Sequence, residues 1–244
     1  MAYTNNSMLI EASELFKKLQ SDNTIIIDCD VSDVFQRAHI KNAKTIPTHH
    51  YIKQKGFEND PKNYPHIMEK NEFDNLITTL NINQKSEIIA YDNSSSLYAT
   101  RFWWCLNYFG IKNIKVLNGG WKKWISGNYP IESGFNYPFS SNKKNLNKNS
   151  TNIKIVENNS YICNITDMKN SINSPNTILF DTRSNGEFNG ANSRGNIRSG
   201  HMPGAIHIEW LGFMDNDHEF KSEVEIQGIL DAKNITHEKE IKTY

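Results

Sequence analysis

The sequence has no excess charge of either sign, and it lacks any long apolar run. Its 244 residues contain 27 Lys and Arg against 27 Asp and Glu, so the formal net charge is zero. A chain without a basic excess has no general attraction for nucleic acid or for an acidic membrane surface. No window approaches the roughly 18 apolar residues of a membrane span, and the N-terminus lacks the basic and apolar regions of a signal peptide. We therefore expect a soluble, cytoplasmic monomer that binds neither nucleic acid nor membrane.

Cysteine is also scarce. Cys29, Cys105 and Cys163 lie far apart, with none of the paired spacings of a disulfide framework or a zinc knuckle. This usage is typical of a reducing compartment. Cys29 follows an apolar run, Cys105 lies inside an apolar helical stretch and Cys163 precedes a predicted helix, so we interpret all three as packing residues.

An internal repeat organises the chain. AHIKNAKTIP, at 38–47, and GHMPGAIHI, at 200–208, each follow a short apolar run that ends in aspartate, IIIDCD in the first copy and ILFDTR in the second. Further on, NQKSEIIAY, ending at Tyr91, aligns with THEKEIKTY, ending at Tyr244. The repeat therefore predicts two domains, at 1–132 and 152–244, joined by a polar linker at 133–151.

Short apolar runs alternate with helical patterns in both copies. The runs at 24–28, 87–91 and 177–181 are too brief for helices and are rich in apolar residues, so they predict buried strands. Apolar residues recur at helical spacing over 71–80, and Ser222 with Glu225 forms a capping box before another helix. This alternation predicts an α/β fold with a mostly parallel sheet flanked by helices in each domain.

Four stretches of the sequence, with Phe188, together resemble the tandem-domain rhodaneses. In the second copy they are Asp181-Thr182-Arg183 with Phe188, and Gly200-His201-Met202-Pro203-Gly204-Ala205; in the first copy they are RFWW at 101–104 and LNGGW at 117–121. The resemblance implies a thiosulfate or 3-mercaptopyruvate sulfurtransferase with two rhodanese-like domains. Such an enzyme moves a sulfane sulfur from a small-molecule donor to a thiophilic acceptor, cyanide or a thiol, through a cysteine persulfide, without a metal or an organic cofactor.

The resemblance also places the nucleophile. It implies a cysteine at the start of the loop after the strand that ends at Tyr244, so we expect the given chain to be a fragment that is truncated before this loop and is itself inactive. In the first copy the corresponding residue is Asp92, which is already anionic and cannot accept sulfur. We interpret Asp92 as a helix-capping residue of a non-catalytic domain.

Three residues of the second copy are candidates for substrate binding. Arg194 stands where the resemblance implies a donor-binding arginine, and a solvated loop arginine is the alternative. Asp181 and Arg183 follow a strand, where α/β folds bind ligands, but such a pair also commonly binds loop backbone and each other. Glu187 replaces a second donor-binding arginine, and its charge would repel an anionic donor, which slightly favours thiosulfate or an unknown donor over mercaptopyruvate.

The remaining conspicuous residues have structural interpretations. His39 and His201 occupy equal positions in the two copies and predict a turn contact, because one copy is expected to be inactive. His49 and His50 lack a third metal ligand and are interpreted as solvated loop residues. The tryptophans at 103, 104, 121 and 124 are interpreted as core.

Two other functions are compatible with parts of this pattern. One alternative is not an enzyme: a non-catalytic rhodanese-homology module that serves in binding or scaffolding. A phosphatase of the related fold would need a cysteine and an arginine around a five-residue anion loop, and the loop at Asp92 is too long before Arg101.

Overall fold

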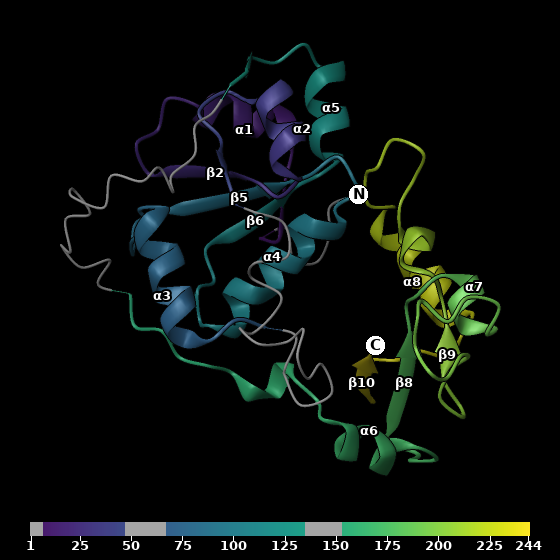
Figure 1. Ribbon diagram of the computed structural model, residues 1–244. Coiled ribbons are helices and arrows are strands. Elements are labelled where there is room, and N and C mark those ends of the chain that lie inside the picture. The colour runs from purple at the N-terminus through teal and green to yellow at the C-terminus, as the bar shows by residue number, and fades with distance from the viewer. Residues whose placement is uncertain (1–6, 47–66, 135–152) are drawn as a thin grey trace. The chain divides into compact units, whose positions relative to one another are not determined.

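The computed structural model describes residues 7–46, 67–134 and 153–244 and divides into two compact units (Figure 1). One unit comprises Asn5–Asn159 with Asp217–Glu219, and the other comprises Ser160–Asn216 with Phe220–Tyr244. We call them the first and the second unit. The predicted linker lies almost entirely outside the described residues, as do His49 and His50, so the domain boundaries remain predictions.

The first unit is built on a five-stranded sheet in which every neighbouring pair is parallel. Its central strands, TIIID and EIIAY, are almost fully buried, because a sheet covered on both faces selects apolar and β-branched residues at consecutive positions. The strand order is β1 (Leu9–Ile10), β6 (Ile114–Leu117), β5 (Glu87–Tyr91), β2 (Thr24–Asp28) and β4 (Lys44–Thr45).

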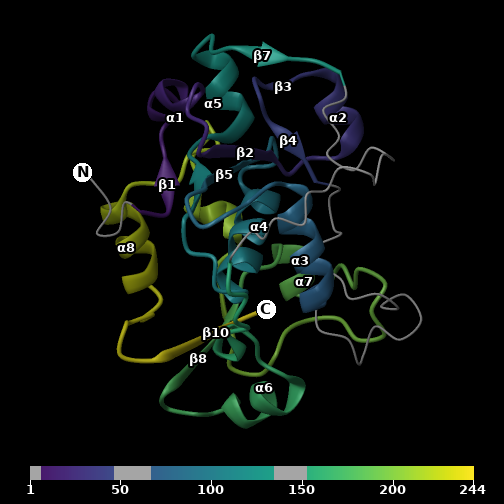
Figure 2. The ribbon, with the colours of Figure 1, turned by 90° about the vertical axis from the view of Figure 1, so that its left-hand side faces the viewer.

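Helices cover both faces of this sheet. Figure 1 shows α1, α2 and α5 on one face and α3 and α4 on the other. A short antiparallel ribbon of β3 and β7 lies beside α2 and α5 (Figure 2). The bounds are α1 (Ala12–Lys18), α2 (Ser32–Arg37), β3 (His39–Ile40), α3 (Lys70–Thr79), α4 (Leu97–Tyr108), α5 (Gly120–Ser126) and β7 (Ile131–Glu132).

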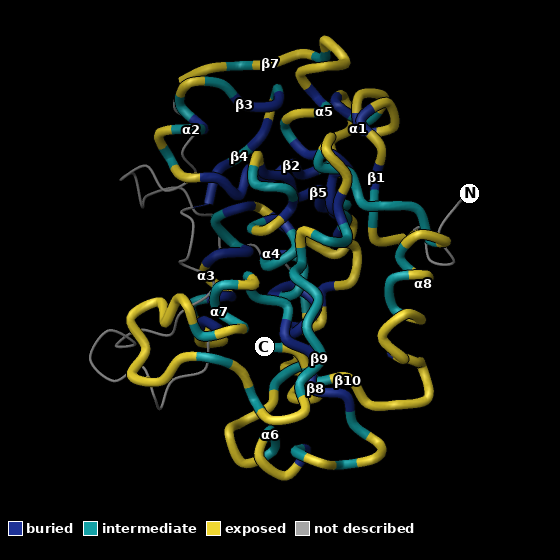
Figure 3. Tube along the Cα trace, turned by 90° about the vertical axis from the view of Figure 1, so that its right-hand side faces the viewer, coloured by how far each residue is buried: buried dark blue, intermediate teal, exposed yellow. Residues whose placement is uncertain are grey.

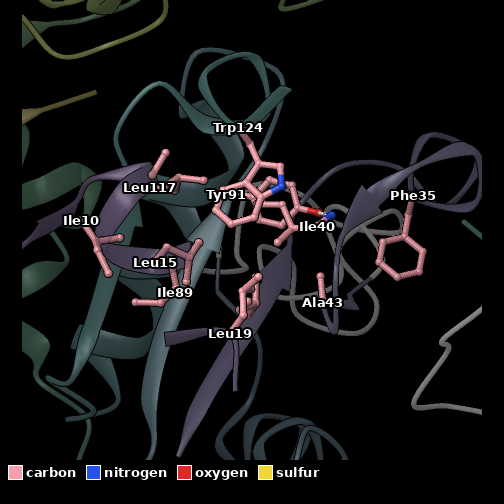
Figure 4. Close-up of a cluster of buried hydrophobic side chains, with 12 residues drawn as sticks. Ile10, Leu15, Leu19, Phe35, Ile40, Ala43, Ile89, Tyr91, Leu117 and Trp124 are labelled. Atoms are coloured by element: carbon pink, nitrogen blue, oxygen red, sulfur yellow. Dashed lines mark hydrogen bonds between the residues drawn. The ribbon is translucent and has the colours of Figure 1, made fainter. Parts of the chain in front are cut away.

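One cluster of buried residues in the first unit lies between the sheet and the α1, α2 and α5 layer, and fully buried residues of α3 and α4 such as Phe73 and Phe102 pack on the other face. Trp124 and Tyr91 are its largest fully buried side chains, and the Trp124 indole N–H donates to the carbonyl of Pro130 at 3.0 Å. Figure 4 shows how side chains from strands and helices meet there. The cluster consists of Ile10, Ala12, Leu15, Leu19, Ile26, Phe35, Ile40, Ala43, Ile89, Tyr91, Leu117 and Trp124.

The second unit has a parallel three-stranded sheet and a smaller core. Its buried cluster is limited to Ile178, Phe180 and Ile235, and most of its chain is exposed or half-buried (Figure 3). The strand order is β10 (Glu240–Thr243), β8 (Thr177–Asp181) and β9 (Ile206–His207). Its helices are α6 (Ile165–Ser171), α7 (Asn185–Phe188) and α8 (Glu223–Asp231), with short 3₁₀ turns η1 (Asn159–Tyr161) and η2 (Trp210–Phe213).

The α/β prediction is confirmed, since mostly parallel sheets are flanked by helices in this structure. The strands at 24–28, 87–91 and 177–181 have the predicted bounds, and Ser222 caps α8 through Glu225 as expected. No helix in the described ranges is long and apolar enough to cross a membrane.

Two packing predictions were partly wrong. Cys29 and Cys105 are buried, but Cys163 is exposed, because the segment before α6 runs over the surface. Among the four tryptophans interpreted as core, only Trp124 is fully buried, and those at 103, 104 and 121 are half-buried. Trp104 instead holds the Arg101 guanidinium 4.5 Å from the centre of its ring.

Candidate functional site

The carboxyl ends of the parallel strands gather the polar residues of each unit, as is common in α/β folds. In the first unit the loop after β5 begins with Asp92 and leads into α4. Ser95 and Ser96 both adopt positive φ angles there, 53° and 67°, which turns the backbone N–H groups of the loop toward one point. The result is a cradle of donors at the start of a helix.

The Asp92 carboxylate fills this cradle. One oxygen accepts from the N–H groups of Ser94 at 2.8 Å and Ser96 at 2.9 Å, and the other accepts from Tyr98 and Ala99, both at 2.8 Å. The residue is 1% exposed, and burial raises the pKa of Asp92 although the four donors act in the opposite direction. The predicted helix-capping role of Asp92 is thus confirmed, and each donor of the cradle is engaged.

The LNGGW stretch, at 117–121, packs against the backbone of Asp92. Gly120 has a φ of +50°, and a Cβ atom there would lie 2.2 Å from the carbonyl oxygen of Asp92. That oxygen accepts a hydrogen bond from the N–H of Trp121 at 2.9 Å. Only glycine permits this approach, which explains why the sequence has glycine where α5 begins.

Two further carboxylates lie beside the cradle. The Tyr91 hydroxyl donates to Asp28 at 2.5 Å and accepts from the N–H of Ile40 at 3.0 Å. Asp30 accepts from the N–H of Asn93 at 2.8 Å and so ties β2 to the loop. Burial raises the pKa of Asp28 to about 7 and that of Asp30 to about 6. The first unit therefore gathers buried carboxyl groups around its cradle.

None of the three cysteines matches the requirements of a sulfur-accepting nucleophile, which must be an accessible thiolate. Cys29 is fully buried, and burial together with Asp92 and its neighbouring carboxylates raises the pKa of its thiol. Burial raises the pKa of Cys105 to about 12. Cys163 is exposed, but it precedes α6, which leads to the amino end of β8 and not to the carboxyl end.

In the second unit, Asp181 and Arg183 bind each other. The Arg183 guanidinium donates to both carboxylate oxygens of Asp181, from Nε at 3.0 Å and from Nη2 at 2.6 Å. It also donates to the carbonyl of Gly200 at 3.0 Å. Burial alone would raise the pKa of Asp181, but Arg183 outweighs it and holds the pKa below its usual range. The Tyr244 hydroxyl accepts from the N–H of Met202 at 2.9 Å, and its ring lies 5.0 Å from the guanidinium.

Arg194 is not part of this group. Its Nε atom lies 3.4 Å from Glu187, and its side chain is 68% exposed. Glu187 is itself held by the Ser184 hydroxyl at 2.7 Å, and the hydrogen bond from Ser184, with the charge of Arg194, lowers the pKa of Glu187. The structure thus brings together Asp181 and Arg183, and separately Arg194 and Glu187; their roles in substrate binding remain predictions.

Aromatic stacking was not foreseen from the sequence. Phe188 contacts two imidazoles, with ring centres 3.7 Å from His201 and 4.4 Å from His207. In the first unit His39 stacks on Phe35 at 3.8 Å, and its Nδ1 atom lies 2.8 Å from the Phe35 carbonyl oxygen. The predicted structural contact of His39 is therefore confirmed. A histidine four residues after a phenylalanine was the available signal in the first copy.

Among the residues that the structure describes, no group of three or more His, Cys, Asp or Glu side chains is placed to hold a metal ion.

The sequence and the fold are similar to those of known proteins. Residues 11–126 match the rhodanese-like domain family. The chain is 24% identical over 253 residues to a sulfur carrier protein, TtuD, of Thermus thermophilus, with 100% of this chain and 84% of the relative aligned. It is 27% identical to the thiosulfate sulfurtransferase of Gallus gallus, with 67% of this chain and 54% of the relative aligned.

The 3-mercaptopyruvate sulfurtransferase of Escherichia coli is 26% identical over 72% of this chain and 60% of the relative. In both sulfurtransferases, the match thus spans only a little more than half of the relative's length. Among solved structures, the crystal structure of SseA from Escherichia coli, a 3-mercaptopyruvate sulfotransferase, superimposes with a TM-score of 0.77 at 21% identity and covers 98% of this chain and 88% of that one.

Proposed function

We propose that the protein serves sulfur transfer of the rhodanese type, because residues 11–126 match the rhodanese-like domain family and the chain has the rhodanese fold. A sulfane sulfur moves from thiosulfate or 3-mercaptopyruvate to a thiophilic acceptor, such as cyanide or a thiol. The observation that carries the proposal is the cradle of four converging N–H groups at the carboxyl end of β5, which holds the Asp92 carboxylate and so is suited to an anion. The equivalent loop of the second domain is proposed to hold the sulfur anion. The name of the Thermus relative, a sulfur carrier protein, supports the same class of chemistry.

The proposal includes two copies of one domain, at 1–132 and 152–244, with a linker at 133–151. Equivalent contacts in the two units support it. In both units, a tyrosine hydroxyl forms a hydrogen bond with the aspartate that ends a strand. The same hydroxyl accepts a hydrogen bond from the backbone N–H of the residue after a histidine. That histidine stacks on a phenylalanine. The equivalent residues are Asp28 and Asp181, Phe35 and Phe188, His39 and His201, Ile40 and Met202, and Tyr91 and Tyr244.

The first domain is proposed to be catalytically silent. Asp92 occupies the position of the nucleophile, and its carboxylate already uses the four donors that would stabilise a bound sulfur anion. A carboxylate oxygen cannot accept a sulfane sulfur to form a persulfide. The buried Cys29 nearby cannot substitute for it, because its thiol stays protonated.

The second domain is proposed to carry the chemistry. A thiolate attacks the outer sulfur of thiosulfate, the sulfur–sulfur bond of the donor breaks, and sulfite leaves with the bonding pair. The acceptor then attacks the outer persulfide sulfur, and the thiolate is regenerated. Arg183, Asp181 and Arg194 are the proposed donor-binding residues, Arg183 and Arg194 by charge and Asp181 by fixing the guanidinium of Arg183.

The sulfur carrier is proposed to be a cysteine other than Cys29, Cys105 and Cys163. Two of these are buried and protonated, and the third lies away from the carboxyl ends of the strands. In a longer polypeptide, a cysteine after Tyr244 would stand at the place that Asp92 occupies in the first unit.

The filled cradle of the first unit also favours a second candidate function, a non-catalytic rhodanese-homology module that binds or positions partners. The two functions separate in one assay, in which the protein from its natural source is incubated with thiosulfate and cyanide. Sulfur transfer predicts thiocyanate at a rate that saturates with thiosulfate. A rate equal to that of buffer alone, with thiosulfate and again with 3-mercaptopyruvate as the donor, would reject the sulfurtransferase and leave the binding module.

A further inference from the structure

Glu187 and Arg194, which follow β8, form an ion pair whose two side chains differ in how far they are exposed. One oxygen of Glu187 is fixed by Ser184, whose hydroxyl donates at 2.7 Å and whose N–H donates at 3.4 Å. The other oxygen faces the Nε atom of Arg194 at 3.4 Å. The Glu187 side chain is 13% exposed and that of Arg194 is 68% exposed. The carboxylate is therefore held in place, whereas the guanidinium is largely in solvent.

The backbone of Arg194 is more firmly placed than its head group. Its φ angle is 51°, and its N–H donates to the Asn192 side chain at 3.0 Å, within a loop whose Gly195 also has a positive φ of 80°. The contact with Glu187 is longer than a strong charge-assisted hydrogen bond, and exposed pairs of this kind contribute little to stability. A ligand can therefore exchange with this ion pair at small cost.

The two charges discriminate between classes of ligand. A dianion such as thiosulfate gains from Arg194 but is repelled by the fixed carboxylate of Glu187. An α-amino acid carries an ammonium group beside its carboxylate, so it can pair with Glu187 and Arg194 at once and leave neither charge uncompensated. The arrangement is complementary to a zwitterion.

We propose that Glu187 and Arg194 select a sulfur donor built on an α-amino acid, such as a cysteine persulfide, over thiosulfate. The inference rests on the proposed sulfur transfer and names its donor class. In the transfer, the carrier thiolate attacks the outer sulfur of the donor, a bond forms between these two sulfurs, and the donor's sulfur–sulfur bond breaks. The amino-acid thiolate leaves with the bonding pair, so no oxidant or reductant is consumed.

Binding to the 244-residue chain tests the selection without any turnover. The probes are L-cysteine, 3-mercaptopropionate, which lacks only the ammonium group, and thiosulfate, with dissociation constants from NMR titration of the backbone amides around Glu187. We expect L-cysteine to bind more tightly than 3-mercaptopropionate by roughly fivefold, the size of one partly exposed charge pair. Equal affinities, tighter thiosulfate binding or no binding of any probe would overturn the proposal.

Variants locate the effect. Glu187→Gln is expected to remove the preference for L-cysteine and to strengthen thiosulfate binding, and Arg194→Gln is expected to weaken every anionic probe. The matched control is Glu225→Gln, because Glu225 forms the same kind of capping box with Ser222 at α8. Among the described residues, Glu225 forms no ion pair with an arginine. A loss of preference in the Glu225 variant, or its retention in the Glu187 variant, contradicts the assignment.

The inference and the proposed function fail in different ways. A protein that forms thiocyanate but prefers thiosulfate to L-cysteine rejects the donor class and keeps the sulfurtransferase. A protein that prefers L-cysteine but forms no thiocyanate from either thiosulfate or a cysteine persulfide keeps the binding selection and rejects the transfer.

Discussion

The two units differ most at the residue two positions after the aspartate that ends the strand. In the first unit this residue is Asp30, which lies with Asp28 and Asp92 beside the loop, and burial raises the pKa of all three carboxyl groups. In the second unit it is Arg183, which donates two hydrogen bonds to Asp181 and neutralises it. Similar tyrosine contacts therefore surround a group of carboxyl groups in one unit and a neutralised ion pair in the other.

The units also differ in packing. One cluster of the first unit joins twelve buried residues, whereas the cluster described in the second unit joins three. Stability should therefore be more sensitive to truncation of a buried side chain in the first unit than in the second.

The sharpest test of this difference is a pair of equivalent truncations. Phe35 is fully buried and stacks on His39, so Phe35→Ala should cost about 4 kcal/mol of unfolding free energy. Phe188 is only half-buried, and Phe188→Ala should cost about 1–2 kcal/mol. Urea unfolding followed by peptide-resolved hydrogen exchange reports each unit separately. Equal costs would contradict the contrast in packing.

The cradle of the first unit should depend on Asp92. Asp92→Ala leaves four loop N–H groups without their acceptor and is expected to destabilise the first unit by about 3 kcal/mol. Asp92→Asn keeps one acceptor oxygen and should cost roughly half as much. Amide exchange at Ser94, Ser96, Tyr98 and Ala99 measures the effect locally. Unchanged protection in the alanine variant would show that the carboxylate does not hold the loop.

The pH dependence of stability should have opposite signs in the two units. Burial raises the pKa of Asp28 to about 7, so the folded first unit keeps a proton that the unfolded chain loses near pH 4. The contribution of Asp28 to stability is therefore fully present below about pH 4 and declines as the pH rises toward 7, by on the order of 2 kcal/mol between about pH 5 and pH 8. Asp28→Asn should flatten this decline.

In the second unit the sign reverses. Arg183 holds the pKa of Asp181 below its usual range, so the stability that the pair contributes is present at neutral pH and is lost as the pH falls through the lowered pKa. Hydrogen exchange of β2 and β8 peptides across the pH range compares both trends in one experiment. A common sign would contradict the inverted charge.

The smallest expected effect concerns the two hydrogen bonds from Arg183 to Asp181. Arg183→Lys keeps the charge but loses this bidentate pairing and the hydrogen bond to the Gly200 carbonyl. The unfolding free energy of the second unit should therefore fall by about 1 kcal/mol. The matched control is Lys233→Arg, because Lys233 is an exposed residue of the same unit, and this change should be nearly neutral. The midpoint of urea unfolding measures both, and a neutral Arg183→Lys variant would mean that the bidentate pairing is not structural.

Much of this fold follows from local sequence. Runs such as TIIID and EIIAY define buried strands because each position must be apolar or β-branched when both faces of a sheet are covered. Asp92 was recognised as a capping residue from its place before a helix. The exposure of Cys163 was missed, because no local pattern reports the path of an irregular segment.

The site was less predictable, since its contacts join residues that are distant along the chain. Tyr91 reaches Asp28 across 63 positions, and Tyr244 reaches Met202 across 42. The Glu187 and Arg194 pair depends on how the loop after α7 turns back, which its asparagines and glycines leave open. Residue types could suggest binding there, but only the folded chain shows which charges meet.

The most direct test of the account is to map sulfane sulfur on the protein isolated from its natural source. After incubation with thiosulfate or a cysteine persulfide, alkylation and peptide mass spectrometry would locate the added sulfur atom. The account predicts one cyanide-sensitive sulfur on a peptide that contains none of Cys29, Cys105 and Cys163. Sulfur on any of these three, or on no peptide at all, would contradict it.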